Sequence, residues 1–146
     1  MCIRDSSQTD TFTVSADVVS SCTITANDLD FGNYDPTSLT DVTGTTTIVA
    51  NCTIGTDYNI ALDLDGAADA ESREMAGPGV DTLTYGLYQD VTLLVPWGEG
   101  GDVLNTPVLT VGTGANQTHT VYGSITAGQG IQIGSYSDTV TATLSY

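Results

Sequence analysis

The chain has 146 residues and a formal net charge of −16 at pH 7, because 18 Asp and Glu side chains stand against only 2 basic ones. Both basic residues are arginines, Arg4 and Arg73, so lysine-dependent chemistry such as Schiff-base formation is excluded. So acidic a chain is repelled by phosphate backbones and anionic membrane surfaces, which excludes nucleic-acid binding. With 40% hydrophobic and 14% charged residues, the composition is that of one folded globular domain.

Residues 1–7 contain no apolar stretch of the length that a secretory signal peptide needs, and no apolar run of the chain is long enough to span a membrane. We expect either that a leader lies outside this sequence or that these first residues are not native, and we assign them no function. Residues 1–20 are expected to form an N-terminal extension, and residues 21–146 the folded domain.

Apolar residues recur at every second position in short segments that turn residues separate, which predicts strands rather than helices. The predicted strands are 11–20, 22–25, 29–31, 45–52, 58–64, 82–88, 92–95, 107–111, 118–125 and 139–146. Residues 65–81 are acidic and rich in Gly and Ala, and we expect them to form the longest loop. Short strands at this spacing predict an all-β, immunoglobulin-like β-sandwich.

The first predicted strand, residues 11–20, is apolar on one face only. That face consists of Phe12, Val14, Ala16 and Val18. The strand precedes both cysteines of the domain, and nothing before it fixes its position. Such a strand can pair within its own domain or be lent to another molecule, and the residues leave both possibilities open.

Cys22 and Cys52 each lie in strand-like sequence, and a bridge between them would join two neighbouring strands. Closing a loop of about 30 residues contributes roughly 3 to 4 kcal/mol in chain-entropy models. Such a bridge implies an oxidising compartment, whereas two free thiols would imply a cytosolic protein. The third cysteine, Cys2, lies outside this loop.

Catalytic and metal-binding patterns are weak. The sole histidine, His119, has no second histidine or nucleophile motif beside it, so we expect an ordinary strand residue and no enzyme. No Cys-x-x-Cys pair occurs, and we expect no metal and no cofactor. Asp63, Asp65, Asp69 and Glu71 resemble part of a calcium loop, but a solvated acidic loop is the favoured interpretation over weak cation binding. Trp97 beside Gly98 is expected to anchor a turn rather than to stack on a sugar.

The last predicted strand also has one apolar face. That face consists of Val140, Ala142, Leu144 and Tyr146, and the intervening residues carry hydroxyl groups. This pattern is typical of a core strand at the end of a sandwich.

Several segments together carry a resemblance that none carries alone. They are Cys22-Thr23-Ile24, residues 29–36 (LDFGNYDP), Cys52, residues 58–62 (YNIAL), Arg73, Met75, residues 83–88 (LTYGLY), Trp97-Gly98, residues 121–125 (VYGSI) and residues 134–146. In this order and spacing the chain resembles the spore coat protein U domain family, which includes the subunits of archaic (Csu-type) chaperone–usher pili.

The resemblance implies an incomplete immunoglobulin-like β-sandwich that is completed in trans by an N-terminal donor strand. A periplasmic chaperone would fill the groove first, and the extension of the next subunit would then replace it, which is a form of β-augmentation. Phe12, Val14, Ala16 and Val18 would be the donor face, and Val140, Ala142, Leu144 and Tyr146 would border the groove.

The function implied is that of a structural shaft subunit of an extracellular fibre, exported through the periplasm with a chaperone and an outer-membrane usher. Its polymer would consist of identical subunits and would serve adhesion and biofilm formation. The alternative is a self-contained, secreted carbohydrate-binding or adhesin module that uses Trp97.

Overall fold

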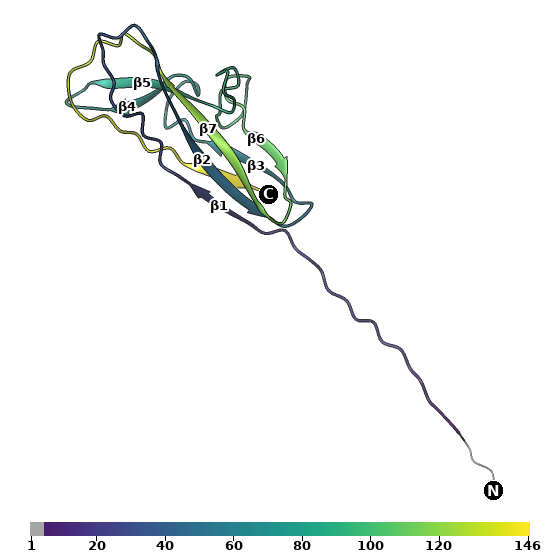
Figure 1. The fold of residues 1–146 in the computed structure, drawn as a ribbon. Helices are drawn as coiled ribbons and strands as arrows, with labels where there is room; N and C mark the ends of the chain where they lie inside the picture. Colours follow the sequence, from purple (N-terminus) through teal and green to yellow (C-terminus); the bar gives the residue numbers. More distant parts are fainter. Residues whose placement is uncertain (1–4) are drawn as a thin grey trace.

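The computed structural model describes residues 5–146, so Cys2 and Arg4 lie outside the described residues. These residues form eight strands (Figure 1). The strands are β1 (Cys22–Ala26), β2 (Val42–Cys52), β3 (Asp57–Leu62), β4 (Arg73–Ala76), β5 (Thr82–Tyr88), β6 (Val108–Val111), β7 (Asn116–Ile125) and β8 (Ala142–Ser145).

The strands form two antiparallel sheets. One has the order β1-β2-β7-β5-β4, and the other has the order β6-β3-β8. The two sheets pack as a sandwich, which confirms the predicted all-β, immunoglobulin-like class. Within residues 5–146 there is no helix with the length and apolarity to cross a membrane.

The core lies between the sheets and follows the alternation in the sequence. In β2 the buried residues are Ile48, Ala50 and Cys52, and in β3 they are Tyr58, Ile60 and Leu62. Because successive side chains of a strand point to opposite faces, one apolar residue in two is enough to line the interior. Threonines occupy many of the outward positions of β2 and β7.

The prediction of a continuous loop over residues 65–81 is wrong, because β4 (Arg73–Ala76) lies within it. β4 pairs with β5 in the register Arg73↔Tyr85 to Ala76↔Thr82. Its sequence, Arg-Glu-Met-Ala, has no β-branched residue, so its strand conformation depends on the neighbouring strand rather than on local propensity.

The predicted strand 92–95 is also absent. The carboxylate of Asp90 accepts hydrogen bonds from the backbone N–H groups of Leu94 and Val95 at 3.1 and 2.8 Å, which folds this segment into a turn. The carboxylate thereby replaces the ladder hydrogen bonds that a strand would have made.

Arg73 ties the two sheets together although its side chain is buried, with only 1% of its surface exposed. From β4 its guanidinium donates hydrogen bonds to the backbone carbonyls of Asp63, Leu62 and Trp97. These carbonyls belong to the end of β3 and to the β5–β6 connection. Burial lowers the pKa of Arg73, and the nearby Tyr85 and Asp63 partly offset this effect.

We expect Arg73→Lys to lower the free energy of unfolding by about 3 kcal/mol. A single ammonium group cannot span the carbonyls that the guanidinium fork joins, and a hydrogen bond from a charged donor contributes about 1.5 to 3 kcal/mol. Urea unfolding at pH 7 measures the change, with the exposed neighbour Glu74→Gln as the matched control. A loss below about 1 kcal/mol would show that Arg73 does not join the sheets energetically.

Candidate functional site

An open groove of about 960 Å³ lies between the two sheets. Its floor is formed by apolar residues of four strands: Ile48 of β2, Leu62 of β3, Leu87 of β5 and Val121 and Ile125 of β7. One wall is formed by residues 26–34 with Pro36, and the other by residues 131–140 with Ala142. The groove therefore reaches down to the hydrophobic core, and its floor residues keep only 1–4% of their surface exposed.

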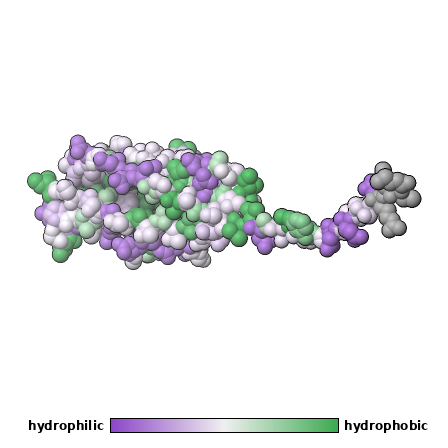
Figure 2. Space-filling view, turned by 90° about the horizontal axis from the view of Figure 1, so that it is seen from below, coloured by the Kyte–Doolittle hydropathy of each residue, from purple (hydrophilic) through white to green (hydrophobic). Residues whose placement is uncertain are grey.

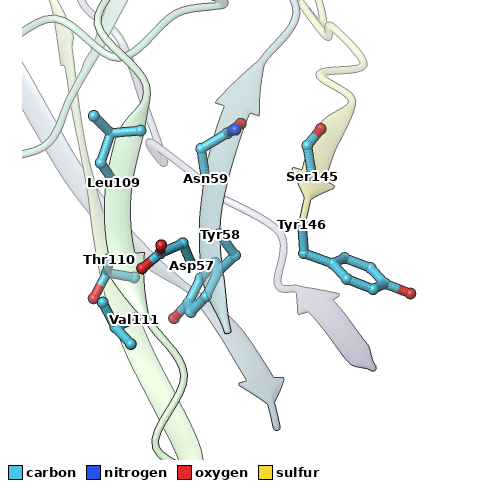
Figure 3. Close-up of a pocket in the computed structure, with 8 residues that line it drawn as sticks. All are labelled: Asp57, Tyr58, Asn59, Leu109, Thr110, Val111, Ser145 and Tyr146. Atoms are coloured by element: carbon cyan, nitrogen blue, oxygen red, sulfur yellow. The ribbon is translucent and has the colours of Figure 1, made fainter. Parts of the chain in front are cut away.

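Two free strand edges border this region. Among the described residues, β1 pairs only with β2, and β8 pairs only with β3. β1 and β8 approach each other across the two sheets and run in opposite directions (Figures 1 and 3). Their free N–H and C=O groups can pair with an added strand, as edge strands generally can.

The segment 29–31, predicted as a strand, is a wall of the groove and forms no strand. Leu29 and Phe31 pack over the centre of the larger sheet, where Gly44 faces Gly123 in the β2–β7 register. A Cβ atom at Gly123 would lie 2.6 Å from Phe31 Cζ, so only glycine leaves room for this ring. Gly44 and Gly123, in the middle of β2 and β7, are the feature of the sequence that could have indicated this wall.

A polar contact connects the two sides of the groove. Phe31 stacks edge-on against Tyr85 with ring centroids 6.1 Å apart. The Tyr85 hydroxyl donates a hydrogen bond to the carboxylate of Asp138 in the opposite wall. Burial, followed by this hydrogen bond, raises the pKa of Tyr85, so its hydroxyl stays protonated and remains a donor at neutral pH.

The N-terminal extension, residues 5–21, makes no strand with its own domain and runs away from it (Figure 1). Phe12, Val14 and Val18 are 88%, 83% and 88% exposed, and Ala16 is also exposed. The extension is tied to the domain at Ser21, whose N–H donates to Thr53 Oγ1 and whose carbonyl accepts from the Thr53 N–H. The apolar face that was predicted to be a donor is therefore exposed and is not buried by its own domain.

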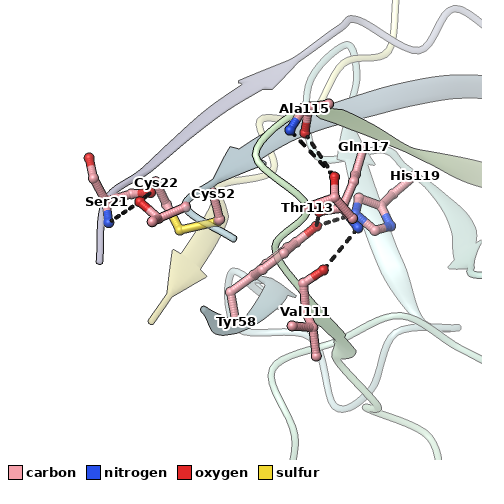
Figure 4. The surroundings of a disulfide bond; sticks show 10 residues. Ser21, Cys22, Cys52, Tyr58, Val111, Thr113, Ala115, Gln117 and His119 are labelled. Atoms are coloured by element: carbon pink, nitrogen blue, oxygen red, sulfur yellow. Dashed lines mark hydrogen bonds between the residues drawn. A yellow bond between two sulfur atoms is a disulfide. The ribbon is translucent and has the colours of Figure 1, made fainter. Parts of the chain in front are cut away.

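A disulfide bond joins Cys22 and Cys52 where the extension enters the sandwich, which confirms the expected bridge (Figure 4). The two residues are direct partners in the β1–β2 register, and their Cα atoms are 4.1 Å apart. The bond therefore holds β1, which carries a free edge beside the groove, to the end of β2.

The predicted face of the last strand divides along its length. Val140 and Ala142 line the groove, and Leu144 packs against the core. Tyr146 lies beyond the end of β8 and is 63% exposed. With Ser145, Asn59 and Leu109 it lines a shallow hollow on the outer face of the smaller sheet (Figure 3).

His119 is a half-buried residue of β7, as expected. Its Nε2 lies 3.0 Å from the hydroxyl of Tyr58, which also donates to Gln117 at 3.2 Å (Figure 4). Burial lowers the pKa of His119. These contacts join the two sheets, and no nucleophile is among them.

Trp97 is fully buried, and its indole N–H donates to the carbonyl of Ile60 at 2.9 Å. This confirms the anchoring role and contradicts the alternative in which Trp97 stacks on a sugar. In the acidic segment, Asp63 accepts from the Thr141 N–H and Asp69 from the Ser72 hydroxyl. No group of three or more metal-ligating side chains is found among residues 5–146.

Comparisons with known proteins agree with this fold. The family described as Spore Coat Protein U domain matches residues 8–143. Protein U of Myxococcus xanthus is 33% identical over 131 residues, which cover 81% of this chain and 71% of that protein.

A similar fold occurs in a crystal structure of the CsuC–CsuE chaperone–tip adhesion subunit pre-assembly complex from the archaic chaperone-usher Csu pili of Acinetobacter baumannii. The TM-score is 0.58 at 22% identity, over 88% of this chain and 40% of the other. The chain therefore spans less than half of that protein chain, and the likeness concerns the fold. From the family match and the relative at 33% identity it follows that this chain belongs to the Spore Coat Protein U domain family.

Proposed function

We propose that this chain is a structural shaft subunit of a chaperone–usher pilus, in which the donor face of one copy fills the groove of the next. One observation carries the proposal: a groove that ends on the apolar core and an exposed segment with one apolar face coexist in one chain. Each supplies what the other lacks, and no contact joins the donor residues Phe12, Val14 and Val18, which are more than four-fifths exposed, to the groove of their own domain.

The direction of the added strand follows from the edges. A donor that runs antiparallel to β8 would extend the β6-β3-β8 sheet with the same kind of pairing, which is somewhat more stable per residue than parallel pairing. Since β1 and β8 run in opposite directions, that donor would run parallel to β1. The extension cannot reach this orientation in its own groove, because only Val19, Ser20 and Ser21 separate the donor face from β1.

The donor has enough length and apolar surface for this role. Ten extended residues span roughly 33 Å, about the length of a small sandwich. Burial of Phe12, Val14 and Val18 at roughly 1.5 to 3 kcal/mol each contributes on the order of 6 kcal/mol. Edge hydrogen bonds add about 0.5 to 1.5 kcal/mol each, less the entropy of ordering the segment. Durability of the fibre would then come mainly from slow unfolding of the completed core.

The assembly route and location are part of the same proposal. Before polymerisation, a periplasmic chaperone would occupy the groove, and an outer-membrane usher would pass subunits into an extracellular fibre. The similar fold in the crystal structure of a chaperone–tip adhesion subunit pre-assembly complex supports this route. The apolar donor segment favours the shaft over the tip, because a subunit within the shaft fills the groove of a neighbour as well as receiving a donor. The role proposed is structural and not enzymatic, since His119 serves the contact between the sheets.

A synthetic peptide of residues 10–20 tests the groove directly. At a free concentration 100-fold above its Kd, it should stabilise the subunit by about 2.7 kcal/mol. For a domain of this size the melting temperature should rise by roughly 8 °C, and growth of polymers should stop. The same peptide with aspartate in place of Val14 is the control. Equal melting curves with and without the native peptide would contradict the proposal.

A further inference from the structure

Three aliphatic side chains stand almost fully in solvent at the end of the sandwich farthest from the extension. Leu39, Val80 and Ile133 are 97%, 95% and 96% exposed. They belong to the β1–β2, β4–β5 and β7–β8 connections, which meet at that end (Figure 1). In the space-filling view that end shows separate hydrophobic protrusions among hydrophilic residues (Figure 2). We call these three residues the distal pole.

The loops that carry the distal pole are fixed by hydrogen bonds to acidic side chains. Asp35 accepts from the Thr37 N–H at 2.8 Å, and Asp41 accepts from the Ala127 N–H at 2.8 Å. Asp81 accepts from the N–H of Gln132, which links the loops of Val80 and Ile133. Each of these carboxylates accepts a hydrogen bond from a backbone N–H group of the same chain. The loops are therefore held in one conformation, with the aliphatic side chains in solvent.

The opposite end of the sandwich, at the disulfide, also exposes aliphatic side chains. Ile54 in the β2–β3 turn is 77% exposed, and Val19 in the extension is 73% exposed. The two segments are joined by the hydrogen bonds between Ser21 and Thr53. We call Ile54 and Val19 the disulfide pole.

The short linker of the extension would bring these two poles together in a polymer. A donor antiparallel to β8 leaves the groove at the distal end, where residues 131–136 and 29–36 form its walls. Four Cα–Cα steps join Val18, the last residue of the donor face, to Cys22, which starts β1. These steps span at most about 14 Å. The disulfide pole of the incoming subunit must therefore sit directly on the distal pole of the subunit that receives its donor.

We propose that successive copies of this chain make a second, apolar contact, in which Leu39, Val80 and Ile133 of one copy pack against Ile54 and Val19 of the next. This inference rests on the proposed function and assigns the occupant of the distal pole: a second copy of the same chain. Ion pairs between residues 5–146 of two copies cannot hold the poles together instead, since the one arginine in this range, Arg73, is buried. The contact would limit bending at each joint of the fibre.

Cysteine cross-linking of assembled fibres tests the contact. In a Cys2→Ser background, the pair Ile54→Cys with Val80→Cys should cross-link under mild oxidation and yield a ladder of covalent multimers in hot, non-reducing denaturant. The control pair is Ile54→Cys with Leu94→Cys. Leu94 is 77% exposed, like Ile54, but belongs to the β5–β6 connection. This connection lies along the flank of the sandwich and away from the distal end (Figure 1). We expect at least tenfold more multimer from the first pair.

Other outcomes overturn the inference in distinguishable ways. Normal fibres without a ladder from the Val80 pair would show that the poles do not touch. Covalent dimers without longer multimers from Ile54→Cys alone would show that disulfide poles face each other, with the donor parallel to β8. A parent that never polymerises would overturn the proposed function and this contact together.

A second variant measures the mechanical consequence. Leu39→Asp, at a residue of the distal pole that does not line the groove, should leave polymerisation intact but shorten the persistence length of fibres on electron micrographs at least twofold. Leu94→Asp, at a similarly exposed aliphatic residue, should leave it unchanged. Equal persistence lengths for the two variants would contradict a stiffening contact at the poles.

Discussion

Val14→Asp is expected to abolish fibre formation and to leave the soluble subunit as stable as before. Val14 is 83% exposed in the free subunit, so the substitution removes no contact there. In the groove of a neighbour the valine would contribute up to about 3 kcal/mol, equal to roughly a hundredfold in the equilibrium constant. A buried carboxylate without a partner adds a further cost of several kcal/mol. Electron microscopy measures the fibres, and thermal unfolding measures the subunit.

Thr13→Asp is the matched control for this variant. Thr13 is the adjacent residue and points to the opposite face of the extended segment, so the same charge would remain in solvent. We expect fibres from Thr13→Asp and none from Val14→Asp. Normal fibres from both variants would remove the donor role from this face, and failure of both would point to charge repulsion rather than to side-chain burial.

Replacement of Cys22 and Cys52 together by serine is expected to lower the free energy of unfolding by about 3 to 4 kcal/mol. The bond closes a loop with a sequence separation of 30, and chain-entropy models assign this amount to its constraint on the unfolded chain. The effect should extend to assembly, because the bond holds β1, one of the two free edges beside the groove. Urea unfolding under non-reducing conditions measures the difference.

Two controls separate this effect from thiol chemistry. A Cys2→Ser variant removes the third thiol and should unfold at the parent's urea midpoint. Addition of a reductant should lower the stability of that variant to the level of the double variant and should not affect the double variant. If the double variant unfolds within about 1 kcal/mol of the parent, the bond does not restrict the unfolded chain as the entropy argument requires.

The sequence predicted the elements whose apolar residues alternate strongly. β5 has the predicted bounds, and β3, in which Tyr58, Ile60 and Leu62 are buried, differs by one residue at its start and two at its end. The Cys22–Cys52 bond was predictable because both cysteines lie in such strands. Local alternation is sufficient in these cases because each strand buries one complete face.

Features that depend on tertiary context were not predictable in the same way. β4 has a sequence of low strand propensity and exists through its pairing with β5. Leu29 and Phe31 alternate like a strand but pack through their side chains onto glycines of β2 and β7. Arg73 stood out only as one of two basic residues, and nothing nearby in the sequence indicates that it joins two sheets.

The groove was expected only through the resemblance to a family. Its floor comes from four strands and its walls from residues 26–36 and 131–142, which are separated by about two thirds of the chain. Alternation in Val140, Ala142 and Leu144 is the same for a closed core strand and for a strand beside an open groove. Which neighbour a strand lacks is a property of the topology and cannot be read from the strand itself.

Solid-state NMR on polymers of mixed labelling tests the central claim most directly. One half of the subunits carries ¹³C and the other half ¹⁵N, so that only contacts between copies give ¹⁵N–¹³C cross-peaks. Our account predicts such peaks between the backbone of residues 12–18 in one copy and that of residues 140–144 in another. The contradicting result would be contacts between residues 12–18 and residues 140–144 that a uniformly labelled sample shows and that are missing as ¹⁵N–¹³C peaks from the mixed polymer. In that case both segments belong to one copy, the sandwich is completed by its own chain, and the account is wrong.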